Sequence, residues 1–316
     1  MNAAMLSRLG ILIRREFWQS PVAFKWAPVG ILVLNVVLVL FAILIGAKMD
    51  NGFQFTLEGV RAFTELPDEQ KDLLVSAAMY STGSLYHGTA LIVILFYLAG
   101  CLYDDRRDRS ILFWKSLPVS DTLTVASKLL TAMLAVPLAY LAVVAVNQIV
   151  LLIIASFFGW AAGIDVFREL WLSSALPQIW AVQIYAIVVQ GLWLLPIYGW
   201  LMFCSAIAPR LPILIAVLVP LVISLVQHFW SLLTAFRLPD INLLAIIGKR
   251  IGRGVVPMSM EIDVSNGSIE EITRDMLISF RSVTHTLLSL EMLYGILIGA
   301  LFLAGAIWFR RRAADI

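Results

Sequence analysis

Six apolar stretches, each about 20 residues or longer, constrain this chain more than any other feature of its sequence. A bilayer core of about 30 Å requires about 20 helical residues, since a helix rises about 1.5 Å per residue. The stretches are Trp26–Ala47, Ser84–Tyr103, Leu129–Phe158, Ile179–Ala208, Ile213–Leu233 and Leu290–Phe309. They predict an all-α membrane protein with six transmembrane helices.

The composition agrees with this prediction. The chain has 61% hydrophobic and 14% charged residues, whereas a soluble domain has about 45–50% and about 25%. The first stretch is followed by Lys48, Met49 and Asp50, not by a small-residue cleavage site, so we expect a retained helix and not a signal peptide. Cys101 and Cys204 lie within apolar stretches, which indicates buried thiols.

Lys and Arg residues divide the connecting segments into two sets. The first set carries 13 basic residues in 61 positions and the second carries 10 in 112. Basic residues concentrate on the cytoplasmic side of a membrane, so the first set, with both chain ends, is expected there. The first set is 1–25, 104–128, 209–212 and 310–316, and the second, external set is 48–83, 159–178 and 234–289.

Two connecting segments carry an amphipathic pattern. In the segment 1–25, Leu6, Leu9, Ile13 and Phe17 share one helical face, which Glu16 interrupts. This spacing predicts an interfacial helix in the cytoplasmic leaflet, and the alternative is a plain charged flank. In the segment 234–289, the apolar run Ile241–Ile247 is too short to span a bilayer, so we expect partial helices near the outer surface.

Prolines lie inside three of the six stretches, at Pro137, Pro196 and Pro220. A proline removes one backbone hydrogen bond, so each position predicts a kink. We expect neighbouring helices to satisfy the backbone groups that these prolines leave free.

Sequence motifs for catalysis are absent. The three histidines, His87, His228 and His285, form no HExxH pattern, and the chain has no GxSxG elbow. Its single Gly-Lys dipeptide, Gly248-Lys249, is followed by Arg250 and is not part of a phosphate-binding loop. The chain is therefore expected not to be an enzyme by itself, and any ATPase would be a separate chain.

Few charged residues lie in the middle of the apolar stretches, which argues against a carrier coupled to protons or sodium. The polar residues that remain are amides, which form hydrogen bonds between helices and also line transport pathways. We treat them as possible pathway or interhelix residues: Asn35, Asn147, Gln148, Gln183 and Gln190.

The most informative segment is Asp104–Asp121. It begins with a cluster of acidic and basic residues, continues with apolar bulk that includes Phe113 and Trp114, and ends in Pro-Val-Ser. Ser120 or Asp121 can cap the helix that follows. Aromatic residues on the cytoplasmic side indicate contact with lipid or with a partner protein.

On these residues the segment resembles the corresponding loop of ABC-2 type transporter permeases, the transmembrane subunits of bacterial ATP-binding cassette exporters. The family pattern is a charge cluster, a Ser or Thr, an apolar turn, a Leu and then Pro-Val-Ser before a helix. Here it reads Asp105-Arg106 through Arg109-Ser110, Leu112, Leu117 and Pro118-Val119-Ser120. The order of elements also resembles the type V exporter-like architecture, with an N-terminal elbow, six spans, and a short turn after the fourth.

The resemblance implies a permease in the bacterial inner membrane that exports an unidentified substrate, with hydrophobic or amphipathic compounds as the candidates. A second permease copy would complete a homodimer, and separate cassette ATPase subunits would bind ATP and Mg from the cytoplasm; this chain would bind no cofactor. The loop would carry the coupling helix that docks on the ATPase, with secondary contacts from Arg14, Arg15 and Arg210. The coupling residues would be Arg106, Arg109, Ile111, Leu112, Phe113, Trp114, Leu117 and Pro118.

Three alternatives stay open on the sequence alone. A non-transporting scaffold or sensor could use the same loop to transmit motion. A secondary carrier is disfavoured by the shortage of charges within the apolar stretches, and a membrane-embedded enzyme is disfavoured by the missing catalytic motifs.

Overall fold

The computed structural model describes residues 3–48, 59, 62–109, 119–233, 243–255 and 280–312. Within these ranges every regular element is a helix and there is no strand, which confirms the all-α prediction for the described part of the chain. The elements are α1 (Ala3–Gln19), η1 (Val22–Trp26), α2 (Ala27–Lys48), α4 (Asp68–Arg107), α6 (Asp121–Leu130), η2 (Thr131–Ala135), α7 (Val136–Ala161), η3 (Phe167–Leu172), α8 (Leu176–Trp193), α9 (Leu195–Ile207), α10 (Pro212–Leu233), α11 (Leu243–Val255), α13 (Phe280–Leu287) and α14 (Leu290–Arg312).

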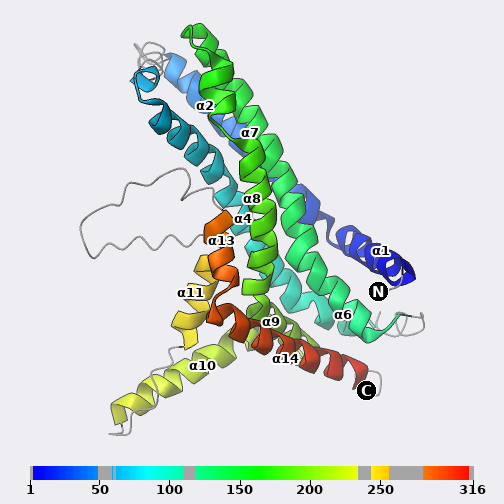
Figure 1. Cartoon of the computed structure of the whole chain (residues 1–316). Coiled ribbons are helices and arrows are strands. Elements are labelled where there is room, and N and C mark those ends of the chain that lie inside the picture. Colours follow the sequence, from blue (N-terminus) through cyan, green and yellow to red (C-terminus); the bar gives the residue numbers. More distant parts are fainter. Residues whose placement is uncertain are drawn as a thin grey trace.

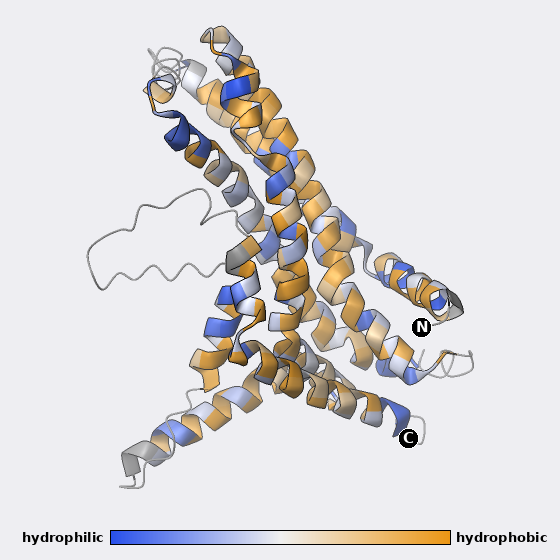
Figure 2. Cartoon of the chain, in the orientation of Figure 1, coloured by the Kyte–Doolittle hydropathy of each residue, from blue (hydrophilic) through white to orange (hydrophobic). Residues whose placement is uncertain are grey.

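In the part of the chain that the structure describes, six helical segments are long and apolar enough to cross a membrane. Figure 1 shows α2, α4, α7 and α8 running alongside one another in a long bundle, with α9, α10 and α14 crossing its lower end. The apolar residues follow the middles of these helices, and hydrophilic residues gather near the ends, as at the end of α14 (Figure 2). The fold is that of a multi-pass, membrane-embedded helical protein.

Two of the helices extend well beyond the apolar stretches that predict them. Helix α4 begins at Asp68, not Ser84, and is 40 residues long, or about 60 Å. The third stretch is the middle of a continuous helical segment, Asp121–Ala161. The extension of α4 is anchored by Lys71, whose Nζ lies 3.0 Å from Glu169 Oε2 on η3.

The fourth apolar stretch is two helices and not one. Helix α8 ends at Trp193 and α9 begins at Leu195, with Pro196 in its first turn. Proline has no N–H to continue the hydrogen-bond ladder of α8, so the chain changes direction at Leu194. Helix α9 then runs parallel to α14, and the two are in close contact along their length (Figure 1).

At two other irregular points neighbouring helices satisfy freed carbonyls, and at one of them, Pro220, the sequence predicts this. Pro220 lies inside α10 and leaves Ala216 O without its helical donor, and Trp200 Nε1 on α9 donates to that oxygen at 3.0 Å. The wide turn of η1 moves the Ala27 N–H to Val22 O, and Tyr140 Oη donates to Ala23 O at 2.8 Å. These bonds fix α10 and η1 to the bundle.

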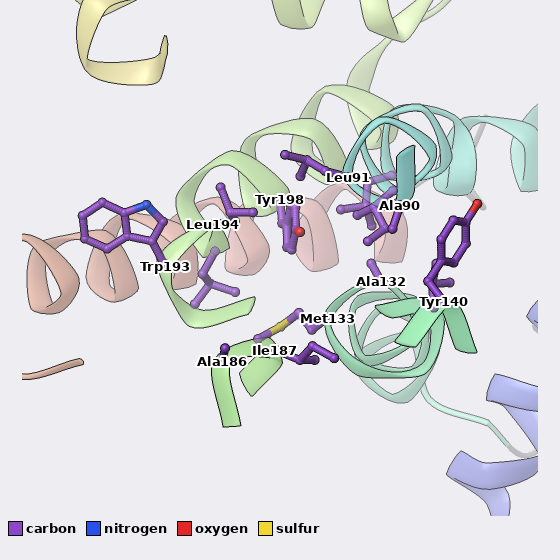
Figure 3. Close-up of a cluster of buried hydrophobic side chains, with 14 of the residues drawn as sticks. Ala90, Leu91, Ala132, Met133, Tyr140, Ala186, Ile187, Trp193, Leu194 and Tyr198 are labelled. Carbon is purple, nitrogen blue, oxygen red and sulfur yellow. The ribbon is translucent and has the colours of Figure 1, made fainter. Parts of the chain in front are cut away.

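The hydrophobic core lies where α4, η2, α7, α8 and α9 meet (Figure 3). Its side chains include Leu91 on α4, Met133 on η2 and Ile187 on α8, and Figure 3 shows Met133 next to Ile187. Tyr140 and Tyr198 are fully enclosed there. By contrast α2 and α10 expose apolar side chains along most of their length, which is the arrangement expected of helices that face lipid.

Between α10 and α14, where the sequence predicts partial helices, the described residues form the short helices α11 and α13. Helix α13 packs on α8, since Tyr185 Oη lies 3.1 Å from Thr284 Oγ1 and the rings of Tyr185 and Phe280 are 5.8 Å apart. Helix α11 contacts α4, α8 and α10. Their position relative to a membrane stays a prediction.

Candidate functional site: a buried ion network

Helices α4 and α6 flank the 110–118 segment, and both contribute side chains to a buried network of charged residues. Asp105 is in the last turn of α4, whereas Asp121 and Lys128 belong to α6. Glu16 from α1 and Arg310 from the last turn of α14 complete the group. Four of these residues are at most 6% exposed, so the network is a part of the protein interior.

Glu16 and Lys128 form the N-terminal half of the network. Lys128 Nζ lies 3.3 Å from both carboxylate oxygens of Glu16. Arg15 Nη2 approaches Glu16 Oε1 at 2.5 Å, and Tyr97 Oη donates to Glu16 Oε2 at 2.7 Å. Both carboxylate oxygens are therefore paired, as a buried charge requires.

Asp105 and Arg310 form the other half. Arg310 Nη1 donates to Asp105 Oδ2 at 3.0 Å, and its Nε donates to Asp121 Oδ1 at 3.1 Å. Lys128 Nζ lies 3.6 Å from Asp105 Oδ1 and so joins the two halves. The planar guanidinium holds one carboxylate from each side of the 110–118 segment, which fixes their separation.

Within the described ranges, the acidic and basic groups that pair in this network are equal in number. Three carboxylates, from Glu16, Asp105 and Asp121, face three cations, from Arg15, Lys128 and Arg310. A buried network is tolerated only when its members are paired, and removing one partner costs about 3–5 kcal/mol. The helices α1, α4, α6 and α14 are therefore held together as one unit at this end of the bundle.

Helix α9 is joined to the same end by Arg106. Arg106 Nη2 donates to Ser205 O at 2.8 Å and to Ala208 O at 2.9 Å. A cation at this position complements the negative end of the α9 dipole. Ser205 Oγ in turn accepts hydrogen bonds from the N–H groups of Leu102 and Tyr103 on α4, each at 3.0 Å.

The two ends of the 110–118 segment have defined caps. Arg109 follows α4 with φ of 56°, a left-handed conformation that ends the helix. On the other side, Ser120 Oγ accepts a hydrogen bond from Leu123 N at 3.2 Å, which confirms the predicted cap of the following helix.

The structure brings together only some of the residues that the sequence singled out. Arg106 donates to carbonyls at the end of α9, and Arg15 belongs to the ion network. Arg14 stacks on Trp18 at 4.8 Å, and Arg210 is exposed in the turn between α9 and α10. The remaining coupling residues lie outside the described residues: Ile111, Leu112, Phe113, Trp114, Leu117 and Pro118.

The predicted polar amides divide into two groups. Gln148 donates to Met79 O at 2.8 Å and accepts from Trp180 Nε1 at 2.7 Å, and Gln190 Nε2 donates to Gly254 O. These bonds serve an interhelix role. Asn147 and Gln183 are buried in the core, and their side-chain amides have no hydrogen-bond partner among the described residues; the same holds for Asn35 Oδ1.

Sequence reasoning did not identify Glu16, Lys128 and Arg310 as parts of one site. Glu16 was visible as the acidic residue that interrupts the apolar face of α1. In the structure it lies on the buried side of that helix, whereas Leu6 of the predicted apolar face is 49% exposed. An acidic residue on an apolar face indicates a buried ion pair, although the sequence does not identify its partner.

No group of three or more His, Cys, Asp or Glu side chains within the described ranges is arranged to hold a metal ion. A scan of protein-family models, a search of curated proteins and a search of solved structures each found no match. A functional conclusion therefore has to rest on the residues of the chain and on the geometry of the network.

Proposed function

We propose that this chain is the permease subunit of an ATP-binding cassette exporter of the ABC-2 type. In this proposal the substrate crosses the membrane through the permease, and ATP is hydrolysed by a separate cytoplasmic ATPase subunit with bound Mg. The proposal places the protein in the inner membrane of a bacterium, as a homodimer with both chain ends in the cytoplasm.

The observation that carries the proposal is the buried ion network at both ends of the 110–118 segment. A segment that receives force from an ATPase must be attached rigidly to the helices that it moves. Asp105 and Asp121 flank the segment and share the guanidinium of Arg310. Lys128 adds the attachment to Glu16 on the N-terminal helix.

This arrangement gives the proposed coupling step a physical route. A displacement of the segment would pass to α4 and α6 through the backbone and to α1 and α14 through the ion pairs. It would also pass to α9, because Arg106 holds the last carbonyls of that helix. Separate movement of any one of these helices would break a buried ion pair or expose it to lipid, which is costly.

The chemistry of the segment itself fits a protein partner. It contains Phe113 and Trp114 and directly follows Arg109, and aromatic residues and Arg dominate the energetics of protein interfaces. The experiment is to purify the protein in mild detergent from its native host and to identify a co-purifying cassette ATPase. The variant Trp114→Ala should then lose most of the association.

The matched control for this experiment is Trp160→Ala. Trp160 is 68% exposed near the end of α7, so the same substitution is made far along the chain from the segment. It should leave the association unchanged. An ATPase that fails to co-purify with the unmodified protein, or that is lost equally from both variants, would remove the basis of the proposal.

A second candidate function, a non-transporting subunit that transmits motion, rests on the same network. The network supports force transmission whether or not a substrate moves. The hydrogen bonds of Gln148 and Gln190 favour it in part, because they assign two candidate pathway residues to helix packing. Transport in liposomes that contain the complex separates the two candidates, since only the exporter requires ATP-dependent accumulation of substrate.

A further inference from the structure

The break between α8 and α9 leaves backbone carbonyls without helical donors, and one of them is satisfied in an unusual way. At η1 and in α10 the freed carbonyls accept from the neutral side chains of Tyr140 and Trp200. At the break, the Ile197 N–H turns to Leu194 O at 2.9 Å, so Trp193 O loses its helical partner. It accepts instead from the charged Arg250 on α11.

Arg250 is held at the break on several sides. Its Nε donates to Trp193 O at 2.7 Å, and its guanidinium carbon lies 4.4 Å from the centre of the Trp193 ring. The contact is reciprocal, because Trp193 Nε1 donates to Arg250 O at 2.9 Å. Arg250 Nη2 also donates to Glu291 O at 3.3 Å, so the side chain bridges α8 and α14.

The surrounding residues leave room for this bridge. A Cβ on Gly295 would collide with the guanidinium of Arg250, and a Cβ on Gly254 would lie 2.7 Å from the side chain of Leu194. Gln190 Nε2 donates to Gly254 O, and Arg253 Nη1 lies 3.6 Å from Glu291 Oε2. Burial lowers the pKa of the Arg250 guanidinium, and the charge of Glu291 opposes this effect.

The Arg250 contacts and the ion network lie at opposite ends of one pair of helices. Glu291 and Arg310 are separated by about 28 Å along α14, at about 1.5 Å per residue. The parallel helices α9 and α14 touch through Gly199 and Gly299, where a Cβ on Gly199 would lie 2.7 Å from Gly299 O. Such close backbone contact prevents the two helices from sliding independently.

We propose that Arg250 is a latch that holds α11 across the α8–α9 break and the start of α14. With the guanidinium in place, the bend is fixed and α8 is tied to α14. Withdrawal of Arg250 releases both ties at once and allows the α9–α14 pair to move against α8. This inference rests on the proposed transport function for its role, in which movement driven at the ion network would release the latch at the far end.

The latch can be tested on the full-length protein by a distance measurement between spin labels. The labels are placed at Ile246→Cys on α11 and Leu301→Cys on α14, which are 50% and 71% exposed, while the native Cys101 and Cys204 are buried. The labelled protein with Arg250 unchanged should give one narrow distance distribution. Arg250→Ala should raise the ratio of long to short distances about tenfold, the change expected for a loss of about 1.4 kcal/mol.

Two further variants keep this test decisive. Lys249→Ala removes the exposed neighbouring cation and should leave the distribution unchanged. Trp193→Phe keeps an aromatic ring but removes the donor to Arg250 O, so it should broaden the distribution even if Arg250→Ala does not fold. The latch is overturned if Trp193→Phe and any folded Arg250→Ala protein give the distribution of Lys249→Ala.

The role of the latch in transport is tested separately, in the complex with the ATPase. Binding of ATP should shift the distribution of the unmodified protein toward that of Arg250→Ala. An assembled complex whose distribution does not respond to ATP overturns the link between the latch and transport. Failure of the ATPase to assemble at all contradicts the proposed function and leaves the detergent measurement on the isolated chain as the test of the latch.

Discussion

Replacing Lys128 by Met is the most informative single perturbation of the ion network. Lys128 is 2% exposed and its ammonium group contacts the carboxylates of both Glu16 and Asp105. Methionine has a similar length and fills the same volume, so the substitution removes the charge and leaves little cavity. What remains is a network with three carboxylates and two cations.

The expected loss in the free energy of unfolding follows from the ion pairs that each carboxylate keeps. Glu16 still has Arg15 at 2.5 Å, and Asp105 still has Arg310 at 3.0 Å. Neither carboxylate is left alone, so the free energy of unfolding should fall by about 3 kcal/mol, the lower end of the range for breaking a buried ion pair. Adding Glu16→Gln should recover part of this loss, with a coupling of about 1–2 kcal/mol between the two positions.

The assay is reversible unfolding of the protein in mixed micelles with increasing sodium dodecyl sulfate, followed by circular dichroism. The control is Lys48→Met, which removes an exposed lysine at the end of α2 and should change stability by less than about 0.5 kcal/mol. If Lys128→Met is as stable as this control, or if the effects of Lys128→Met and Glu16→Gln simply add, the network is not a coupled unit.

Three further substitutions test the packing of the bundle by the same unfolding assay. Asn147→Leu should raise stability by about 1 kcal/mol, because it removes a buried amide that has no partner among the described residues, and a loss would mean that the amide is paired. Gly299→Val should destabilise by more than about 1 kcal/mol through overpacking of α9 against α14, whereas Gly30→Val, with nothing within 4 Å, should not. Trp200→Phe should cost about 1–3 kcal/mol by leaving Ala216 O unpaired, and an unchanged midpoint would contradict that role for the indole.

The apolar runs were sufficient to predict the helical class and the presence of helices long and apolar enough to cross a membrane, because length and hydropathy are local properties. The same criterion missed the first part of α4, which is not apolar. A different signal was available there, since Pro67 followed by Asp68 and Glu69 is a typical helix N-terminus. A search for helix starts would have placed this boundary better than the hydropathy did.

The break at Leu194 could be predicted only in part. Pro196 indicates a disturbance, but the sequence does not distinguish a kinked helix from two separate helices. Which of the two forms depends on whether another element can donate a hydrogen bond to Trp193 O, the carbonyl that loses its helical partner. Here Arg250, far along the chain, does so, and no local pattern connects it with Trp193.

The ion network shows the same limit more clearly. Asp105 and Asp121 belong to the segment that the sequence marked as important, and Lys128 lies in the helix that follows it. Their partners are distant, since Lys128 pairs with Glu16 and Asp105 pairs with Arg310. Charge, spacing and amphipathicity identify each residue as unusual, and only the tertiary packing of α1 and α14 decides which ones meet.

Photo-crosslinking in the native membrane tests whether the 110–118 segment receives an ATPase, as we propose. A photoreactive phenylalanine analogue is incorporated at Phe113 or at Trp114, and at Trp160 as the control, and the crosslinked protein is identified by mass spectrometry. The account predicts that a cassette-type ATPase is captured from the first two positions and not from Trp160. Capture of no such ATPase from either position, or equal capture from Trp160, would contradict it.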